Sequence, residues 1–435
     1  MRNGLASLAA TALVLTGCST TPEQERLPAA TEAAVQPAAS TRTPPTAVVL
    51  TPSATPSTAQ TFTWRSAKAW KNQRVVARPM SGGPEVRAPA RRKAATTARD
   101  SGSVRPAYTA TLRGLQPGTR YRYRVANDGG SAGDFFFTTP ATELEPWTFL
   151  TLGDTQVDNA DRPAAIVKAA VKRFPTANLV LHAGDVVNHP WVHQEWVDLM
   201  AALAPVRMSR NVVASIGNHE QCVLVKNCRS GQAQGFRTYF SSPSNGVTGQ
   251  RPTWYRFDQQ GVRFVVLDSF GSDLAAQARF LDAQLQDNPN RWSVVLLHAG
   301  PFASRADRTN SAVFSTVLPV IEKHDVDLVL SGHDHVFSSG HRGDPDSTVF
   351  ATSVSGPKYY EISRADWDRR GATRARWAER ISTYQVVDVA ADTLRFRSIV
   401  ASKGSGSTPS IAYGAALDDV TITKDADGDK SVTRR

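Results

Sequence analysis

The sequence has very little cysteine: Cys18, Cys222 and Cys228 are the only three in 435 residues. So few cysteines exclude a disulfide-scaffolded fold, and the lack of a second pair argues against a zinc site built on cysteines. Cys222 and Cys228 lie close together in the loop-like stretch "QCVLVKNC". We expect them to form a local disulfide in an exported protein, and two free thiols are the alternative.

Long hydrophobic runs are also missing. The apolar run within "MRNGLASLAATALVLTGCST" is too short to span a bilayer stably, so residues 1–17 are interpreted as a secretion signal. The run ends in "LTGC", which resembles a bacterial lipobox, whose cysteine, here Cys18, is lipidated after cleavage. We therefore expect an exported protein, lipid-anchored to the outer face of the bacterial cell membrane or periplasmic. An ordinary signal peptide with a chance cysteine is the alternative.

The sequence has fewer acidic than basic residues. It contains 39 Asp and Glu and 50 Lys and Arg, which give a formal net charge of +11. Such a charge suits nucleic acid, an anionic membrane surface or an acidic substrate. The arginines are scattered, however, and no predicted helix carries a dense basic stripe interleaved with aromatic residues. We therefore expect no nucleic-acid partner.

The composition divides the first third of the chain into a tether and an all-β domain. Residues 18–45 are rich in Pro, Thr and Ala and have little to bury, which predicts a disordered tether. In residues 46–140 short alternating runs are separated by turns. The clearest piece, "AYTATLRGLQPGTRYRYRV", predicts two strands around a turn, with Tyr121 and Tyr123 on one face. This pattern resembles a fibronectin type III sandwich.

Strands and amphipathic helices alternate from residue 145 to residue 402, which predicts an α/β domain. "WTFLTLGD" and "NLVLHAGD" are typical of buried strands, and "RPAAIVKAAVKRF" places its apolar residues on one helical face. Residues 403–435 are rich in Gly and Ser and then in charged residues. We interpret them as a flexible, solvated C-terminal tail.

Polar residues follow five apolar strands of the α/β domain. They lie in the blocks "GDTQ", "GDVVN", "GNHE", "LHAGP" and "GHDH". In open α/β sheets ligands bind beyond the carboxyl ends of strands, where these blocks lie. One Asp there can instead cap a helix, and one His is more often structural. Five such blocks on successive strands predict a metal site. The candidate ligands are Asp154, Asp185, Asn218, His298, His333 and His335, with Gln156 as a tentative one. His219 and Glu220 lie in the same blocks as candidate catalytic residues.

These five blocks resemble those of the calcineurin-like metallophosphoesterases, and within them the purple acid phosphatases. The resemblance covers roughly residues 46–402, and "GNHE" with "GHDH" carries it most strongly. It implies an N-terminal all-β fibronectin-like sandwich, followed along the chain by an α/β domain of four layers, αββα. It also implies two metal sites that share Asp185: one with Asp154 and His335, the other with Asn218, His298 and His333.

The resemblance further implies a chemistry. Mixed oxygen and nitrogen ligands suit Fe, Zn or Mn, as divalent or trivalent ions, rather than calcium. Two such ions clamp an in-line phosphoryl displacement and supply a metal hydroxide that attacks a small phosphorylated substrate. His219 is implied to stabilise the oxyanion or to protonate the leaving oxygen, and Glu220 to orient His219. A surface salt bridge is the alternative role of Glu220.

Two positions depart from the family's pattern. Asn188 stands where purple acid phosphatases carry a tyrosine, so we predict no purple chromophore and a weaker preference for ferric iron. Gln156 stands where other members carry a histidine, and it is a tentative ligand. The expected activity is that of an acid-phosphatase-like phosphoesterase. A phosphodiesterase or nucleotidase of the same fold, or an inactive surface binding module, is the alternative; the intact ligand set argues against the last.

Overall fold

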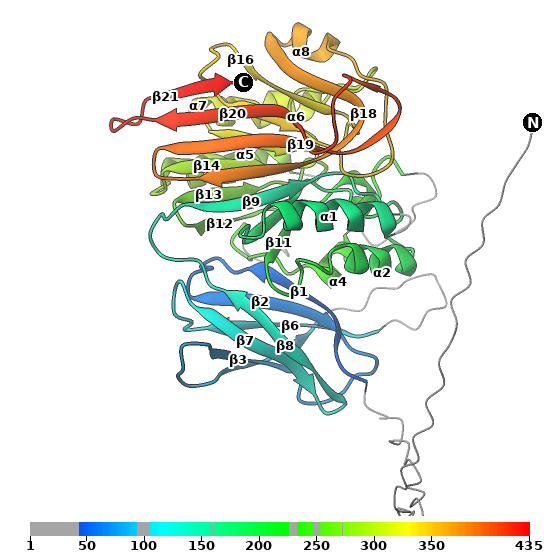
Figure 1. Cartoon of the computed structure of the whole chain (residues 1–435), viewed down its shortest axis with the longest axis vertical. Helices are drawn as coiled ribbons and strands as arrows, with labels where there is room; N and C mark the ends of the chain where they lie inside the picture. The colour runs from blue at the N-terminus through cyan, green and yellow to red at the C-terminus, as the bar shows by residue number, and fades with distance from the viewer. Residues whose placement is uncertain (1–42, 94–104, 158–159, 226–232, 247–252, 272) are drawn as a thin grey trace, which may run out of the picture. The chain divides into compact units, whose positions relative to one another are not determined.

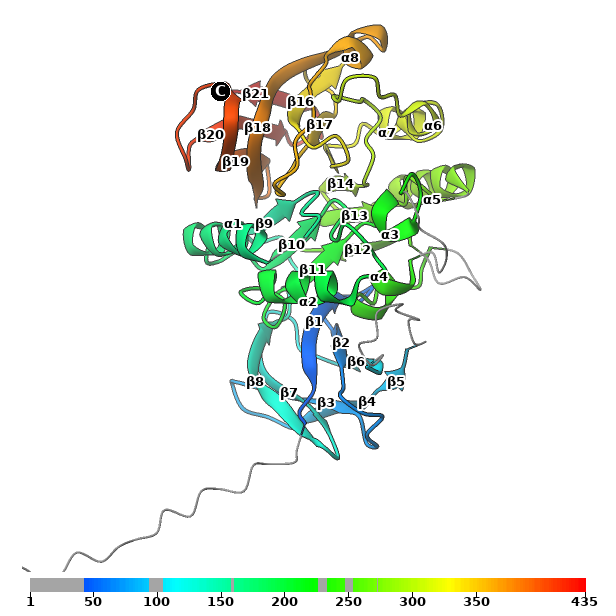
Figure 2. The same cartoon turned by 90° about the vertical axis from the view of Figure 1, so that its right-hand side faces the viewer.

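The computed structural model describes residues 43–93, 105–157, 160–225, 233–246, 253–271 and 273–435 (Figures 1 and 2). The predicted signal peptide, Cys18 and nearly all of the predicted tether lie outside these ranges, as does Cys228. The lipid anchor and the disulfide therefore stay predictions. Among the described helices, none combines the length and the apolar composition that a membrane crossing requires.

The first described segment forms a β-sandwich, as the sequence predicted. One sheet contains β1 (Thr46–Pro52), β2 (Ala59–Arg65), β6 (Ala107–Arg113) and β5 (Arg91–Arg92). The other contains β4 (Val86–Pro89), β3 (Arg74–Pro79), β7 (Arg120–Asn127) and β8 (Gly130–Thr138). Alternate residues of β7 face the core, where Tyr121 and Tyr123 pack with Phe62 and Phe137. The Tyr121 hydroxyl accepts the Gln116 N–H at 2.8 Å, which fixes the turn before β7.

The α/β domain contains two sheets. The first runs in the order β11, β10, β9, β18, β19, β20, β21, and its β9, β10 and β11 are parallel. Leu50 of β1 pairs with Asn211, so the sandwich continues into this sheet. The bounds are β9 (Trp147–Leu152), β10 (Leu179–His182), β11 (Asn211–Ala214), β18 (Ala372–Val389), β19 (Thr393–Thr408), β20 (Ala416–Lys424) and β21 (Lys430–Arg434).

The second sheet runs in the order β12, β13, β14, β15, β17, β16, β18. Strand β18 is 18 residues long and pairs with strands of both sheets, so it links them. The other bounds are β12 (Tyr255–Gln259), β13 (Val262–Val266), β14 (Trp292–Leu296), β15 (Leu328–Ser331), β16 (Phe337–Arg342) and β17 (Val349–Thr352).

Helices cover the outer face of each sheet (Figure 2). Helices α1 (Asp161–Arg173) and α2 (His193–Ala202) pack on the first sheet through an apolar cluster that includes Ile166 and Leu199. Helices α5 (Leu274–Gln286), α6 (Ser311–Thr316), α7 (Leu318–Lys323) and α8 (Ala365–Arg369) contribute to a cluster on the second sheet. A third cluster, with Phe149 and Phe264, fills the space between the sheets. The four layers confirm the predicted αββα fold. Two short helices, α3 (Asn218–Gln221) and α4 (Gln234–Tyr239), lie in loops.

The predicted flexible tail at residues 403–435 is wrong. Strand β19 continues to Thr408, and β20 and β21 extend the first sheet. The sequence "ALDDVTITK" alternates, so that Leu417, Val420 and Ile422 enter the core between the sheets. Two acidic residues of this segment form ion pairs, Asp418 with Arg434 and Asp419 with Arg395.

Candidate metal centre

The predicted site residues come from loops at the carboxyl ends of strands in both sheets. Asp154 follows β9, Asp185 follows β10, and Asn218 begins α3 beyond β11. His298 follows β14, and the "GHDH" loop follows β15. Parallel neighbours end at the same edge of a sheet, so these loops meet. Each of the predicted ligands is buried.

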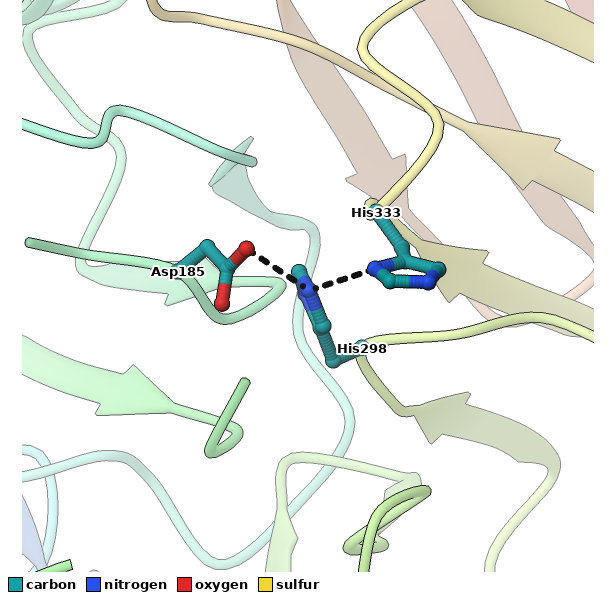
Figure 3. Close-up of side chains that lie close together, drawn as sticks. All are labelled: Asp185, His298 and His333. Atoms are coloured by element: carbon teal, nitrogen blue, oxygen red, sulfur yellow. Dashed lines mark hydrogen bonds and ion pairs between the residues drawn. The ribbon is translucent and has the colours of Figure 1, made fainter. Parts of the chain in front are cut away.

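The first group of side chains consists of Asp185, His298 and His333, and Figure 3 shows His298 between the other two. His298 Nε2 lies 3.1 Å from Asp185 Oδ2 and 3.2 Å from His333 Nδ1. One ligand atom from each of the three residues lies within 4.8 Å of the others. Asn218 Oδ1 joins them at 3.3 Å from His298 Nε2. These four residues converge as one predicted metal site requires.

The second group consists of Asp154, Asp185 and His335, again with ligand atoms within 4.8 Å of one another. His335 Nε2 lies 3.4 Å from Asp154 Oδ1. That carboxylate oxygen is buried and has no hydrogen-bond partner among the described residues. A buried oxygen without a partner is costly, and a cation would satisfy it. The residues present therefore fit two metal ions that share Asp185.

Backbone contacts hold the imidazole ligands in place. His298 Nδ1 donates to the Ala183 carbonyl at 2.6 Å, and His335 Nδ1 donates to the Lys358 carbonyl at 3.0 Å. Each bond leaves Nε2 directed at the cluster. The N–H of His333 donates to Asp154 Oδ2 at 2.7 Å. Such outer contacts fix the tautomer and the orientation of metal-binding histidines.

Burial and mutual charge perturb the titration of these groups. Burial raises the pKa of Asp154 well above its ordinary value. Burial alone would lower the pKa of His298, but the carboxylates of Asp185 and Asp154 raise it to about 9. Burial lowers the pKa of His335 to about 3, and burial with the neighbouring His298 lowers that of His333. These lowered pKa values favour the neutral form of His333 and His335, which is the form that metal ligation requires.

The backbone at the centre is strained. Asp154, Gln156, Asp185, His333 and His335 all adopt positive φ, between 36° and 74°. Such conformations cost energy for residues other than glycine and concentrate at functional sites. They turn the chain sharply after each strand, which directs the side chains toward one another.

Two neighbouring glycines make room for the carboxylates. A Cβ at Gly217 would overlap Asp185 Oδ1, and a Cβ at Gly332 would overlap Asp154 Oδ2. Glycine is therefore required at both positions for the loops to approach this closely.

Both roles predicted for Glu220 are wrong: it does not orient His219, and it does not form a surface salt bridge. Its side chain is buried and accepts three backbone N–H groups, from Asp185 at 3.0 Å, Val187 at 3.1 Å and Gly217 at 2.9 Å. Burial and the nearby Asp185 raise its pKa to about 8. Glu220 therefore joins the "GDVVN" and "GNHE" loops, because its side chain points toward the loop that follows β10.

His219 lies beside the centre and is oriented by another group. Its Nδ1 donates to the Asn188 carbonyl at 2.5 Å, and its backbone N–H donates to Asp185 Oδ1 at 3.0 Å. Its Nε2 lies 3.8 Å from Asp185 Oδ2, and 15% of the side chain is exposed. The ring therefore presents Nε2 at the accessible margin of the cluster.

Gln156 also reaches the centre. Its Nε2 donates to Asp185 Oδ2 at 3.0 Å, while its Oε1 is buried without a hydrogen-bond partner among the described residues. The amide thus contacts the shared carboxylate and offers one unused oxygen. Its role as a ligand stays a prediction.

Sequence reasoning missed two residues around the site. Glu195, at the start of α2, accepts the N–H groups of Asn188 and His189, at 2.7 Å and 2.6 Å, and so holds the loop that orients His219. The Phe270 ring lies edge-on to the His333 imidazole, and the centroids of the two rings are 5.0 Å apart. An acidic residue in the first turn of a helix is ordinarily explained by the helix dipole, so nothing in the sequence singles out Glu195.

The four-layer αββα domain has the metallophosphoesterase fold, and its carboxylate and histidine clusters lie at the strand ends. The family model for the calcineurin-like phosphoesterases matches residues 148–337, and that for the N-terminal domain of purple acid phosphatases matches residues 45–139. Residues 148–337 therefore form a calcineurin-like phosphoesterase domain, which follows a purple acid phosphatase N-terminal domain at residues 45–139.

Relatives and solved structures agree with this family. The uncharacterized protein MT2654 of Mycobacterium tuberculosis is 27% identical over 326 residues, which are 66% of this chain and 60% of that protein. Acid phosphatase type 7 of Mus musculus is 26% identical over 259 residues, or 52% of this chain and 55% of the mouse protein. The chain thus spans less than two thirds of either relative.

Two solved structures share the fold. The purple acid phosphatase PPD1 from yellow lupin (Lupinus luteus) has a TM-score of 0.68 at 16% identity. The match covers 88% of this chain and 75% of the lupin chain. The structure of PhoD has a TM-score of 0.60 at 14% identity, and the match covers 89% of this chain and 91% of the PhoD chain.

Proposed function

We propose that the protein is an exported two-metal phosphoesterase that hydrolyses phosphate monoesters, as an acid phosphatase does. The observation that carries the proposal is the pair of ligand groups that share Asp185, each with ligand atoms within 4.8 Å of one another. The acid phosphatase name of the mouse relative supports the choice of monoesters.

The residues divide between two ions of Fe, Zn or Mn. Asp154, Asp185 and His335 would hold one, and Asp185, Asn218, His298 and His333 the other. Gln156 is a candidate for a further ligand. When bound, such a pair supplies Lewis acidity toward the phosphoryl oxygens and lowers the pKa of the attacking water.

His219 would act on the substrate directly. Because its Nδ1 donates to Asn188, its Nε2 is the nitrogen that faces the cluster. When the ring is in its protonated form, Nε2 also carries a proton and can donate it to a phosphoryl oxygen as charge develops, or to the oxygen of the leaving alcohol. The Asn188 carbonyl and Glu195 hold the ring and its loop in this position.

The test is elemental analysis of the purified protein followed by assays with para-nitrophenyl phosphate and its bis-ester. We expect the monoester to be the better substrate. His219→Asn should lower kcat by about 10²-fold or more with unchanged metal content. The matched control is His324→Asn, since His324 pairs with Asp282 beside helix α7 and takes no part in the site. Metal-loaded protein without activity toward either ester would overturn the proposal.

Localisation is a separate part of the proposal, supported by the "LTGC" sequence before residue 19. The protein would be exported and held by a lipid on Cys18 at the outer face of the cell membrane. Cys18→Ser should move the protein from the membrane fraction to the soluble fraction. Retention of the serine variant in membranes would contradict the anchor.

A further inference from the structure

The net positive charge of the chain is concentrated in one domain. Residues 46–140, which contain the β-sandwich, carry 15 of the 50 Lys and Arg but only 4 of the 39 Asp and Glu, so their formal net charge is +11. The rest of the chain contains the other 35 basic and 35 acidic residues and is neutral. The metal centre therefore does not explain the excess of positive charge, and the sandwich must.

Arginines gather on one face of the sandwich, on the sheet of β4, β3, β7 and β8 (Figure 2). The core takes Tyr121 and Tyr123 from β7, Val75 from β3 and Val86 from β4, so the residues that alternate with them point to the opposite face. All six arginines at these positions are exposed. We call them the arginine face: Arg74, Arg78, Arg87, Arg120, Arg122 and Arg124.

The strand register places these like charges beside one another. Arg78 pairs directly with Arg122 across β3 and β7. Arg87 and Arg124 both pair with Val76, one from each side. Like charges directly opposite each other on neighbouring strands destabilise a sheet. The arrangement therefore costs stability in the isolated protein, and anions bound on this face would offset that cost.

Within the described part of the chain, two of the six arginines form ion pairs. Arg122 lies 2.7 Å from Asp134, and Arg124 lies 3.8 Å from Glu85. The side chains of Arg122 and Asp134 are 58% and 74% exposed, and a pair so exposed contributes little stability. Four positive charges on the arginine face have no acidic partner among the described residues.

A groove and an exposed apolar side chain accompany these charges. The groove is lined by Arg78, Arg122 and Arg124, together with the two acidic residues that pair with them. Met80 directly follows β3 and is 54% exposed, and its backbone N–H donates to the Arg120 carbonyl at 2.8 Å. Basic residues attract anionic headgroups, and an apolar side chain beside them can enter the interfacial layer of a bilayer.

We propose that the arginine face binds the headgroups of an anionic membrane surface. A membrane is favoured over a soluble anion because the sandwich follows the predicted lipid anchor closely: Thr46 lies 28 residues after Cys18. Even a fully extended chain of that length spans no more than roughly 100 Å. A lipid on Cys18 would thus keep the sandwich near the bilayer. The inference uses the proposed anchor and is independent of the phosphoesterase activity.

The test uses the full-length Cys18→Ser protein, so that no lipid on Cys18 contributes, and sedimentation with vesicles. The vesicles contain phosphatidylcholine alone or an equal mixture of phosphatidylcholine and phosphatidylglycerol. We expect binding to the mixed vesicles only, and it should weaken as salt is added, because salt screens exposed charges. A salt wash therefore releases this attachment but not a lipid anchor, so fractionation after such a wash still tests Cys18 alone.

The decisive variant adds Arg74→Gln, Arg78→Gln and Arg87→Gln to this protein. Its binding to mixed vesicles should be weaker by about 10²-fold, because each basic residue near an anionic membrane strengthens binding about fivefold. Equal binding of this variant and its parent would overturn the proposal.

The matched control removes three exposed positive charges from the α/β domain instead: Lys168→Gln and Lys172→Gln in α1 and Arg279→Gln in α5. It has the same net charge as the decisive variant, and we expect it to bind vesicles as the parent does. An equal loss of binding in both variants would overturn the assignment to the arginine face. Binding of the parent to duplex DNA but not to vesicles would overturn the membrane as the partner.

The same proteins separate this inference from the proposed function. Both triple variants should keep the turnover of para-nitrophenyl phosphate, since none of the replaced residues lies at the metal centre. Absence of turnover in every protein would overturn the proposed function and leave the vesicle result standing.

Discussion

At the scale of single residues, one carboxylate collects contacts from several loops. Asp185 lies 3.1 Å from His298 Nε2 and accepts from Gln156 Nε2 and from the N–H of His219, each at 3.0 Å. Its position in both ligand groups agrees with the bridging role that the family pattern implies. Residue type and order predicted this convergence, because each block follows a strand.

Glu220 is the residue for which sequence reasoning failed. Its neighbour His219 made a catalytic pair plausible, but the direction of a side chain in a one-turn helix depends on the loops around it. Here those loops present three N–H groups that need an acceptor. Tertiary packing of this kind has no local signature in the sequence.

We therefore predict that Glu220→Ala lowers the free energy of unfolding by at least about 3 kcal/mol, because each buried N–H without a partner costs roughly 1–3 kcal/mol. Urea unfolding measures the change. Glu220→Gln, which keeps one acceptor oxygen, should lose less, and Glu143→Ala, at an exposed position, should lose almost nothing. A loss of kcat in Glu220→Ala at full stability would instead indicate a catalytic role.

At the scale of elements, the C-terminal hairpin shows where composition misleads. Glycine, serine and charge suggested a tail, yet β20 alternates buried and less buried positions and its acidic residues have arginine partners. The α/β strands and helices were predictable because their apolar patterns are long. The last two strands were not, because pairing partners distant in the sequence neutralise their charges.

Ile422→Ala tests the hairpin directly. Ile422 is fully buried in β20, so we predict a loss of about 2–5 kcal/mol in the free energy of unfolding. Thermal and urea unfolding provide the measurement. The control Asp427→Ala, in the exposed turn between β20 and β21, should be nearly neutral. Equal stability of Ile422→Ala and the unchanged protein would mean that residues 416–424 do not pack.

The ion pair of Asp419 with Arg395 predicts a dependence on pH. The Arg395 hydrogen bonds lower the pKa of Asp419 below its ordinary value. The pair therefore stabilises the fold above the unfolded pKa of Asp419, and this contribution is lost as pH falls through the folded pKa. Asp419→Asn should cost less than about 1 kcal/mol at pH near 7.

Urea unfolding of Asp419→Asn and the unchanged protein across neutral and acidic pH checks this prediction. The difference between them should shrink toward acid, and Asp427→Asn should show no such trend. A difference that grows as pH falls would contradict the assignment of the pair.

At the scale of the whole molecule, two sheets from different parts of the chain meet at one metal centre. Asp154, Asp185 and Asn218 follow strands of the first sheet, and His298, His333 and His335 follow strands of the second. Metal binding therefore couples the two sheets. Removal of metal with a chelator should lower the melting temperature, and metal should restore it, since a ligand that binds only the folded state stabilises it. An unchanged melting temperature in metal-free protein would contradict this coupling.

The most direct measurement is the metal content of purified protein and of Asp185→Asn, determined by elemental analysis together with turnover of para-nitrophenyl phosphate. If Asp185 joins both sites, the unchanged protein should carry two ions per chain, and the variant should lose metal and activity together. Full metal content with unchanged turnover in Asp185→Asn would contradict the shared centre.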